Sequence, residues 1–301
     1  MSTTPNDSKV KPKISIVVIT LGRRTLYELV KRLLQQEIDY EYEIVLISSS
    51  LLESGLLKDK KIKIRYEPRG IGFSHYRNMG VKHSQGEIIV YIDDDEKPIS
   101  VEWLKNLIAP ILNKRTSVAT SGYYVPLGEG YLADSISFLG FPGGGCVGFK
   151  TMWEVDKENY THHICTGNLA IMRKLLGDKE FFNENLRYGS EDVELSERLS
   201  EKSIKISYVE EATVFHEPRR DLFEFVMWQI RRGKAAYEFT RIGSLKKSHT
   251  RNRLKSSIKI VKKSFFTKYF LLVVVFMFIQ NLSHLIGYAI QAIEVNLFKN
   301  D

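Results

Sequence analysis

The chain has 301 residues, of which 43% are hydrophobic and 27% are charged, and its formal net charge is +8. This is the composition of an ordinary globular protein, which excludes a largely disordered chain. The length accommodates one large α/β domain with an appendage. Cys146 and Cys165 are the only cysteines, and their spacing matches no metal site, so we expect a reduced, cytoplasmic setting.

The first thirteen residues are polar and contain two prolines. We expect a disordered tail at 1–13. This segment lacks the apolar stretch of a secretory signal, so we expect the main domain to remain in the cytosol.

Residues 14–218 alternate strand-like and helix-like segments. Runs rich in β-branched residues predict strands at 14–19, 43–47, 62–66, 87–92, 117–125, 204–209 and 212–215. Apolar residues at helical spacing predict helices at 24–36, 74–83, 101–112, 191–202 and 221–240. Glycines and scattered aromatics predict long loops at 126–160. The alternation predicts an α/β fold with a largely parallel sheet covered on both faces.

Three consecutive carboxylates, Asp93, Asp94 and Asp95, follow the predicted strand at 87–92. They repel one another and cannot pack in an apolar core, but at the open end of a strand they can share a divalent cation. Side chains two residues apart in an extended segment point the same way, so Asp93 and Asp95 are expected to converge. In an α/β sheet, that edge is where a nucleotide diphosphate binds. A solvated acidic turn is the alternative.

The positive charge is concentrated near the C-terminus. Residues 219–268 contain fifteen Lys and Arg against three Asp and Glu, a net charge of +12. The next stretch, 269–293, is apolar and has no charged residue, and as a helix it is long enough to span a bilayer. Basic residues beside an apolar helix favour a cytoplasmic membrane face with anionic lipids over nucleic acid as the partner.

Polar residues interrupt the apolar stretch. Gln280 and His284 are four residues apart and share a helix face. Polar groups are costly at mid-bilayer unless they face another helix or a cavity. The segment is therefore expected to span the membrane, to form a homo-oligomer through this helix, or to lie in the interface. A buried helix of a soluble oligomer is a further alternative.

Short motifs occur in a characteristic order. They are Arg77-Asn78-x-Gly80, Gly86 to Pro98 with the acidic triplet, Thr166-Gly167-Asn168, Gly189-Ser190-Glu191-Asp192 and Val214-Phe215-His216. In combination they resemble a family 2 glycosyltransferase with the GT-A fold, a Rossmann-like, mostly parallel sheet with helices on both faces. The resemblance covers roughly residues 14–233.

The resemblance implies a nucleotide-diphospho sugar as donor and a divalent metal, Mg²⁺ or Mn²⁺. Asp95, with Asp93 and His216, is expected to hold the metal through an Asp-x-Asp motif, so that the charge of the leaving diphosphate is neutralised. In this family the first carboxylate of the triplet faces the nucleotide. Further donor-binding residues are expected to be Thr20, Ser48, Ser49, Arg77, Asn78, Asp94 and Arg232.

Asp192 is the expected general base, with Glu191 beside it. Inversion at the anomeric carbon needs an acceptor hydroxyl that loses its proton as it attacks. Both acids also stand at a predicted helix start, where a carboxylate can serve as a cap alone. Gly167, Asn168 and Trp153 are the expected acceptor-binding residues.

The chain departs from the family in one respect. Ser48-Ser49-Ser50 stands where family members commonly carry an acid that binds the nucleotide base, so the sequence does not identify the base of the donor nucleotide.

The sequence thus predicts an inverting, metal-dependent glycosyltransferase at the cytoplasmic face of the cell membrane. A lipid-linked glycan is the expected acceptor, in polysaccharide, glycolipid or protein-glycan biosynthesis. The alternatives are a polyprenyl-phosphate glycosyltransferase, a non-catalytic nucleotide-sugar scaffold and a nucleic-acid-binding protein. The expected divisions are a catalytic domain at 14–218, a basic membrane-proximal segment at 219–268, a membrane helix at 269–293 and a tail at 294–301.

Overall fold

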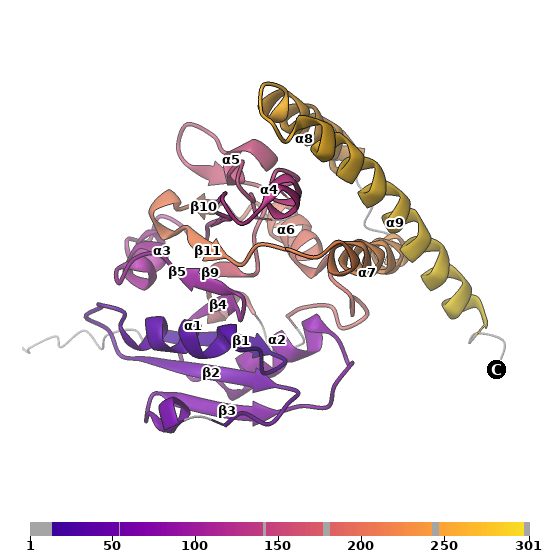
Figure 1. The fold of residues 1–301 in the computed structure, drawn as a ribbon. Coiled ribbons are helices and arrows are strands. Elements are labelled where there is room, and N and C mark those ends of the chain that lie inside the picture. Colours follow the sequence, from indigo (N-terminus) through magenta and orange to yellow (C-terminus); the bar gives the residue numbers. More distant parts are fainter. Residues whose placement is uncertain (1–13, 54, 141–142, 177–180, 243–246, 298–301) are drawn as a thin grey trace, which may run out of the picture.

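A computed structural model describes residues 14–53, 55–140, 143–176, 181–242 and 247–297 (Figure 1). The tail predicted at 1–13 lies outside these residues, as does the end of the chain from 298.

The strands are β1 (Ile14–Thr20), β2 (Tyr42–Ser48), β3 (Ile62–Tyr66), β4 (Ile88–Asp93), β5 (Glu96–Pro98), β6 (Val118–Thr120), β7 (Tyr123–Tyr124), β8 (Tyr160–Thr161), β9 (Asn168–Met172), β10 (Ile206–Tyr208) and β11 (Val214–His216). The helices are α1 (Thr25–Leu34), α2 (Phe73–His83), α3 (Trp103–Leu112), α4 (Tyr131–Ser137), α5 (Phe149–Met152), α6 (Glu191–Glu201), α7 (Leu222–Arg241), α8 (Lys247–Ser264) and α9 (Phe270–Leu297).

The large sheet has the strand order β3-β2-β1-β4-β9-β6-β10-β8. β1 to β4 run parallel, whereas β9 is antiparallel to both of its neighbours, β4 and β6. A small second sheet has the order β5-β11-β7. The mixed, mostly parallel α/β architecture that the sequence predicts is confirmed. The parallel register of β1 and β4 brings their carboxyl ends to the same edge, with Ile19 opposite Asp93.

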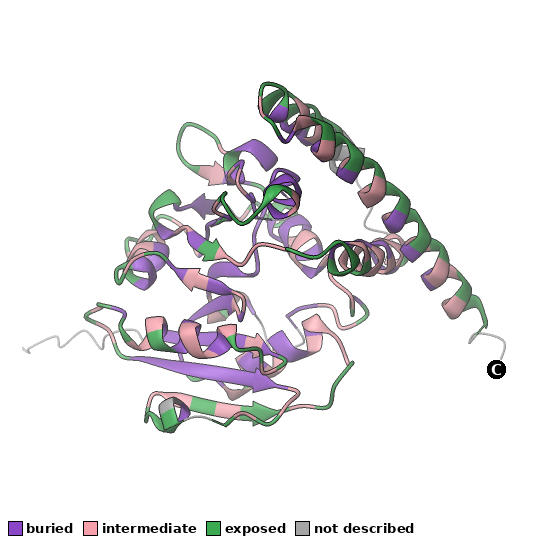
Figure 2. Ribbon diagram, viewed as in Figure 1, coloured by how far each residue is buried: buried purple, intermediate pink, exposed green. Residues whose placement is uncertain are grey.

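The sheet separates two hydrophobic clusters because its side chains alternate between faces. Val18 of β1 joins the cluster that contains α1 and α3, whereas Val17 joins the cluster that contains α2 and α6. Burial on both faces explains why β1, β2 and β4 read as near-continuous apolar runs (Figure 2).

The segment predicted as loops, 126–160, is more ordered than expected, because α4 and α5 lie within it. Both helices are short, so they give little periodic signal. The strand predicted at 117–125 is divided into β6 and β7. At the division, a Cβ on Gly122 would lie 2.5 Å from the Gly143 carbonyl oxygen, so the crossing chain requires glycine.

The C-terminal helices pack against the hydrophobic cluster that contains α1. Tyr269, Val273 and Phe276 belong to that hydrophobic cluster. α9 is the one helix among the described residues that is long and apolar enough to cross a membrane, with a mean hydropathy of 2.0 over its most apolar window. Figure 1 shows it crossing α7 at the edge of the molecule.

Glycines permit the close crossing of α7 and α9. A Cβ on Gly233 of α7 would lie 2.0 Å from the His284 carbonyl oxygen, and a Cβ on Gly287 of α9 would lie 1.9 Å from the Ile230 carbonyl oxygen. The two backbones therefore approach each other where neither helix has a side chain. Backbone atoms on the facing helix cannot rotate away from an added methyl group.

We expect Gly287→Val to lower the free energy of unfolding by about 1–3 kcal/mol, because the overpacked crossing forces the helices apart. Ala289→Val, on the exposed side of the same helix, is the matched control and is expected to change it by less than about 0.5 kcal/mol. Thermal unfolding in mild detergent measures both. Equal stability of the two variants would contradict this account of the crossing.

Candidate active site

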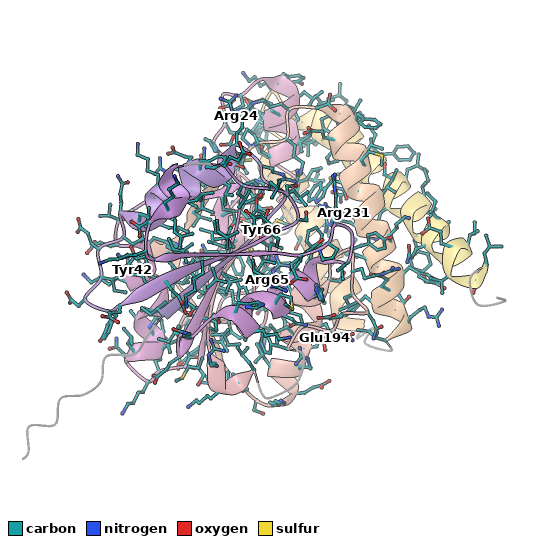
Figure 3. The ribbon with its side chains drawn as sticks, turned by 90° about the horizontal axis from the view of Figure 1, so that it is seen from below. Arg24, Tyr42, Arg65, Tyr66, Glu194 and Arg231 are labelled. Atoms are coloured by element: carbon teal, nitrogen blue, oxygen red, sulfur yellow. The ribbon has the colours of Figure 1, made fainter. Side chains whose placement is uncertain are left out.

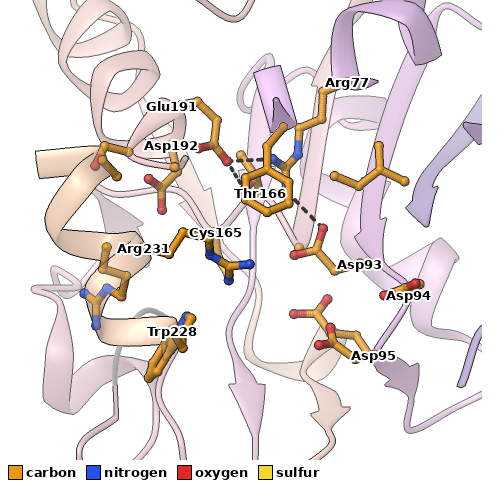
Figure 4. Close-up of a pocket in the computed structure, with 18 of the residues that line it drawn as sticks. Arg77, Asp93, Asp94, Asp95, Cys165, Thr166, Glu191, Asp192, Trp228 and Arg231 are labelled. Atoms are coloured by element: carbon orange, nitrogen blue, oxygen red, sulfur yellow. Dashed lines mark hydrogen bonds and ion pairs between the residues drawn. The ribbon is translucent and has the colours of Figure 1, made fainter. Parts of the chain in front are cut away.

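A cavity of about 270 Å³ opens at the edge where β1 and β4 end. Its walls come from the segments after these two strands, from α2, from the loop before β9, from the start of α6 and from α7. In Figure 4 the acidic triplet lies on one side of the cavity, and Asp192, Trp228 and Arg231 lie on the other. The fold therefore brings together residues that are more than a hundred positions apart.

The first two carboxylates of the triplet have separate partners. Arg77 donates to Asp93 (Nη2–Oδ1 3.0 Å), and the Thr20 hydroxyl donates to Asp94 (Oγ1–Oδ2 2.6 Å). Burial raises the pKa of Asp93, although Arg77 opposes the rise. Burial raises the pKa of Asp94 to about 6. The Thr20–Asp94 hydrogen bond thus joins the carboxyl ends of β1 and β4.

Asp95 is the carboxylate best suited to hold a cation. Arg23 donates to it (Nη1–Oδ2 2.9 Å), and His216 Nε2 lies 3.7 Å from Oδ1. Burial opposes its ionisation, but the charges of His216, Arg23 and Arg219 hold the pKa of Asp95 below its ordinary value. An ionised carboxylate beside an imidazole is a donor set that fits Mn²⁺ or Mg²⁺.

The protein ligands alone make an incomplete metal site. Among the described residues, no group of three or more His, Cys, Asp or Glu side chains is arranged to hold a metal ion. This fits a metal that is bound by one or two carboxylates and completed by substrate phosphates, as is usual for Mg²⁺. Asp93, Asp95 and His216 all line the cavity.

A buried arginine joins the triplet to the Glu-Asp motif. Arg77 donates to Glu191 (Nη1–Oε1 2.6 Å) as well as to Asp93, and it is only 4% exposed. Thr166 also donates to Glu191 (Oγ1–Oε1 3.3 Å). Through these bonds the Glu191 carboxylate anchors the start of α6. The catalytic roles of Glu191 and Asp192 stay predictions.

Asp192 has the features of a general base. It lies in the first turn of α6, where the Val193 N–H donates to Oδ1 (2.8 Å). Burial first, and then the charge of Glu191, raise the pKa of Asp192 to about 7. His163 Nε2 lies 3.8 Å from Oδ2, and the His163 ring stacks on Trp153 with centroids 3.5 Å apart. A carboxylate that titrates near neutrality is suited to accept a proton at neutral pH.

Two predicted acceptor residues line the cavity, and one does not. Gly167 and Trp153 are on its wall. Asn168 is fully buried, and its amide donates to the Gly122 and Ala212 carbonyls (3.0 and 2.7 Å). Its carbonyl oxygen accepts from the Trp103 indole (3.2 Å). The geometry gives Asn168 a structural role, and we do not retain it in the acceptor site.

Three predicted donor residues, Ser48, Ser49 and Asn78, do not line the cavity. The Ser48 hydroxyl donates to the Ser50 carbonyl (2.7 Å). The Asn78 amide donates to the Phe182 carbonyl and to Glu184 (both 2.9 Å). Neither of these residues lines the cavity, nor does Ser49. In contrast, Thr20 and Arg232 are on its wall, as are Arg77 and the triplet.

The structure adds residues that the sequence analysis did not assign to the site. They are Arg23, Glu96, Tyr123, His163, Cys165, Thr166, Arg219, Trp228 and Arg231. Burial and the nearby charges of Arg219 and Arg23 lower the pKa of Arg231, so this wall is a cationic cluster suited to an anionic ligand. The helical spacing of 228, 231, 232 and 235 could have identified this face of α7 from the sequence. Figure 3 shows Arg231 on the side of α7 that faces the sheet.

Residues 15–178 match the family described as Glycosyl transferase family 2. The chain belongs to this family. The resemblance stated from the motifs is therefore confirmed, as are an enzyme of this class and its GT-A fold.

Solved structures support the fold of this family 2 glycosyltransferase. The mannosyltransferase PcManGT from Pyrobaculum calidifontis, in complex with GDP-Man and Mn²⁺, has a TM-score of 0.58 at 15% identity over 97% of this chain and 89% of that one. Residues 1–349 of TarS from S. aureus, in complex with UDP-GlcNAc, have a TM-score of 0.52 at 18% identity over 85% of this chain and 74% of that one.

A curated relative is also similar in sequence. An uncharacterised protein from Sinorhizobium fredii is 23% identical over 141 residues, which are 44% of this chain. The match spans 15% of the length of that relative.

We expect Arg77→Met to lower the free energy of unfolding by about 3–5 kcal/mol at neutral pH, because the buried Glu191 carboxylate and the half-buried Asp93 carboxylate lose their counter-charge. The loss should shrink as the pH falls, since protonated carboxyl groups need no counter-charge. Arg220→Met is the control, because Arg220 pairs with Glu129 on the surface, and the loss of that pair should cost less than about 1 kcal/mol. Urea unfolding at several pH values measures both. If both variants lost the same free energy of unfolding, Arg77 would not be the residue that supports the site.

Proposed function

We propose that this glycosyltransferase moves a sugar from a nucleotide-diphospho sugar to an acceptor hydroxyl, with inversion and with a divalent metal. One observation carries the proposal. A single cavity joins the ionised Asp95 and its histidine neighbour to a carboxylate with a pKa of about 7 on the opposite wall. This is the pair of functions that inverting sugar transfer needs, because the leaving group and the attacking hydroxyl lie on opposite sides of the anomeric carbon.

The donor end is the triplet side of the cavity. Asp95 and Asp93, with His216, would hold Mg²⁺ or Mn²⁺, and the metal would neutralise charge on the departing diphosphate. The arginines of α7, Arg231 and Arg232, face the same space and supply fixed positive charge for phosphate oxygens. The structures of PcManGT and of residues 1–349 of TarS were obtained with nucleotide sugars, which supports a donor of this class.

The acceptor end is the Asp192 side. Asp192 accepts the hydroxyl proton as the oxygen attacks, and its raised pKa keeps it able to take that proton near neutral pH. Trp153 and Trp228 line this region and offer apolar surface to a sugar ring. A base is unnecessary when the acceptor is already a phosphate anion. The presence of Asp192 therefore favours a lipid-linked glycan over a bare polyprenyl phosphate.

Turnover with the purified full chain tests the proposal. A panel of nucleotide sugars is supplied with Mg²⁺ or Mn²⁺, and release of nucleoside diphosphate is measured. We expect at least one donor to be turned over, and Asp95→Ala to reduce metal-dependent turnover at least about a hundredfold. Asp59→Asn, which removes an exposed carboxylate outside the cavity, should have no effect. If no donor is consumed, or if Asp95→Ala is as active as the control, the proposal fails.

The pH dependence tests the base. Because Asp192 must be ionised, kcat/KM should rise with pH through about 7. Glu191→Gln removes a negative neighbour that raises the pKa of Asp192, so the rising limb should move to lower pH. Asp192→Asn should lower kcat by about 10²–10⁴-fold across the range. An unshifted limb in Glu191→Gln would assign the titration to another group.

A further inference from the structure

α9 has an apolar outward side, unlike an ordinary surface helix. Its buried positions are the apolar Val273 and Phe276 in its first half and the small or polar Ser283, Gly287 and Gln291 in its second half. Its exposed positions are mostly large and apolar; they include Leu271, Val274, Val275, Phe278, Leu282, Leu285, Ile286, Ile293 and Leu297. A helix on a water-facing surface has the opposite arrangement. The outward stripe therefore requires a covering other than water.

The inward face of α9 is held to the protein by polar contacts along α7. Gln229 donates to Gln280 (3.3 Å), and Lys234 forms an ion pair with Glu294 (2.8 Å). At the other end of the helix, the Tyr269 hydroxyl donates to Asp134 of α4 (2.8 Å). One side of α9 is thus occupied over almost its whole length, about 42 Å at ~1.5 Å per residue. Hydrocarbon cannot surround a helix that is docked in this way.

The apolar stripe continues into the turn before α9 and into α8. Phe266 is 95% exposed, and Phe265, Ile258 and Leu254 are exposed beside it. Exposed lysines accompany these residues; they are Lys255, Lys259, Lys262, Lys263 and Lys268. Figure 2 shows α8 and α9 along one edge of the molecule, with exposed residues on both. We call this continuous surface of α8, α9 and the turn between them the lipid face.

We propose that the lipid face lies flat on a membrane that contains anionic lipids, with the α9 stripe sunk into the interface and the α8 lysines at the headgroups. α9 then does not cross the bilayer. This inference deepens the proposed function and rests on it only for the identity of the acceptor. A long apolar stripe flanked by lysines and phenylalanines is the pattern of a helix that binds in the plane of the interface.

Charge favours lipid over a second copy of the chain as the occupant. In a twofold dimer the same surface meets itself, so the lysine-rich α8 of one copy would be brought toward that of the other. That approach is repulsive, whereas acidic headgroups complement it.

The lipid face is also connected to the cavity wall through α7. α7 carries Trp228, Arg231 and Arg232 on the cavity wall, and its other side packs on α9. α9 and α7 therefore separate the lipid from the site of sugar transfer. An acceptor whose lipid part stays in the membrane would need to reach past these two packed helices.

Binding to vesicles tests the proposal without any substrate. The full chain is mixed with preformed vesicles of phosphatidylcholine alone or with phosphatidylglycerol, and the bound fraction is measured by co-sedimentation. We expect binding at least about tenfold stronger to the anionic vesicles. The double variant Phe278→Asp with Leu285→Asp should weaken that binding at least about tenfold. Leu51→Asp, at an exposed leucine far from the lipid face in sequence, is the matched control and should bind as the parent does.

Topology and oligomeric state provide the opposing outcomes. A protease-cleavable tag after residue 301 should remain accessible outside the vesicles, because α9 lies in the plane of the interface. Protection of the tag would mean that α9 spans the bilayer, and it would overturn the proposal. Loss of a dimer in the double variant, with no vesicle binding by the parent, would assign the face to a second copy. Donor turnover by a protein that does not bind vesicles would leave the proposed function intact and reject only this inference.

Discussion

The buried guanidinium of Arg77 is the interaction on which the site depends. It connects α2 to the end of β4 through Asp93 and to the start of α6 through Glu191. The buried Glu191 carboxylate and the half-buried Asp93 carboxylate would repel each other without this cation between them. Because Arg77 fixes both, the triplet and Asp192 hold a defined separation across the cavity. Of the adjacent positions, Glu191 is held by Arg77, whereas Asp192 is the one proposed to act as the base.

Arg23 neutralises Asp95 in a way that a bound cation could replace. Arg23 bonds the same Asp95 carboxylate that would take a metal, but its side chain is 48% exposed. It can move into solvent at little structural cost, unlike Arg77, which is held on two sides. The two arginines thus have different functions beside one acidic triplet. One is part of the fold, and the other is a counter-charge that a cation can replace.

The sequence was sufficient to predict the sheet and most of the charged residues that line the cavity. The order and spacing of the motifs predicted Arg77, Asp93, Asp95 and Asp192. Asp93 and Asp95 stand at the end of a buried strand, where a charged side chain must face the open edge of the sheet. The sequence could not separate polar residues that bind ligands from those that bind the backbone. Asn168 satisfies two carbonyls and an indole, and nothing in its neighbours along the chain indicates those partners.

The same limitation affects the prediction for the C-terminal helix. Along the sequence, Gln280 and Ser283 look like defects in a membrane span, because hydropathy assigns one environment to a whole segment. In the fold, α9 has two environments, and α7 supplies the polar one through Gln229. Because Gln280 has this partner, its cost in a bilayer no longer counts against an apolar surface on the opposite side of the helix. A long apolar helix with an internal polar stripe is therefore better described by the pair of surfaces that it touches than by its mean hydropathy.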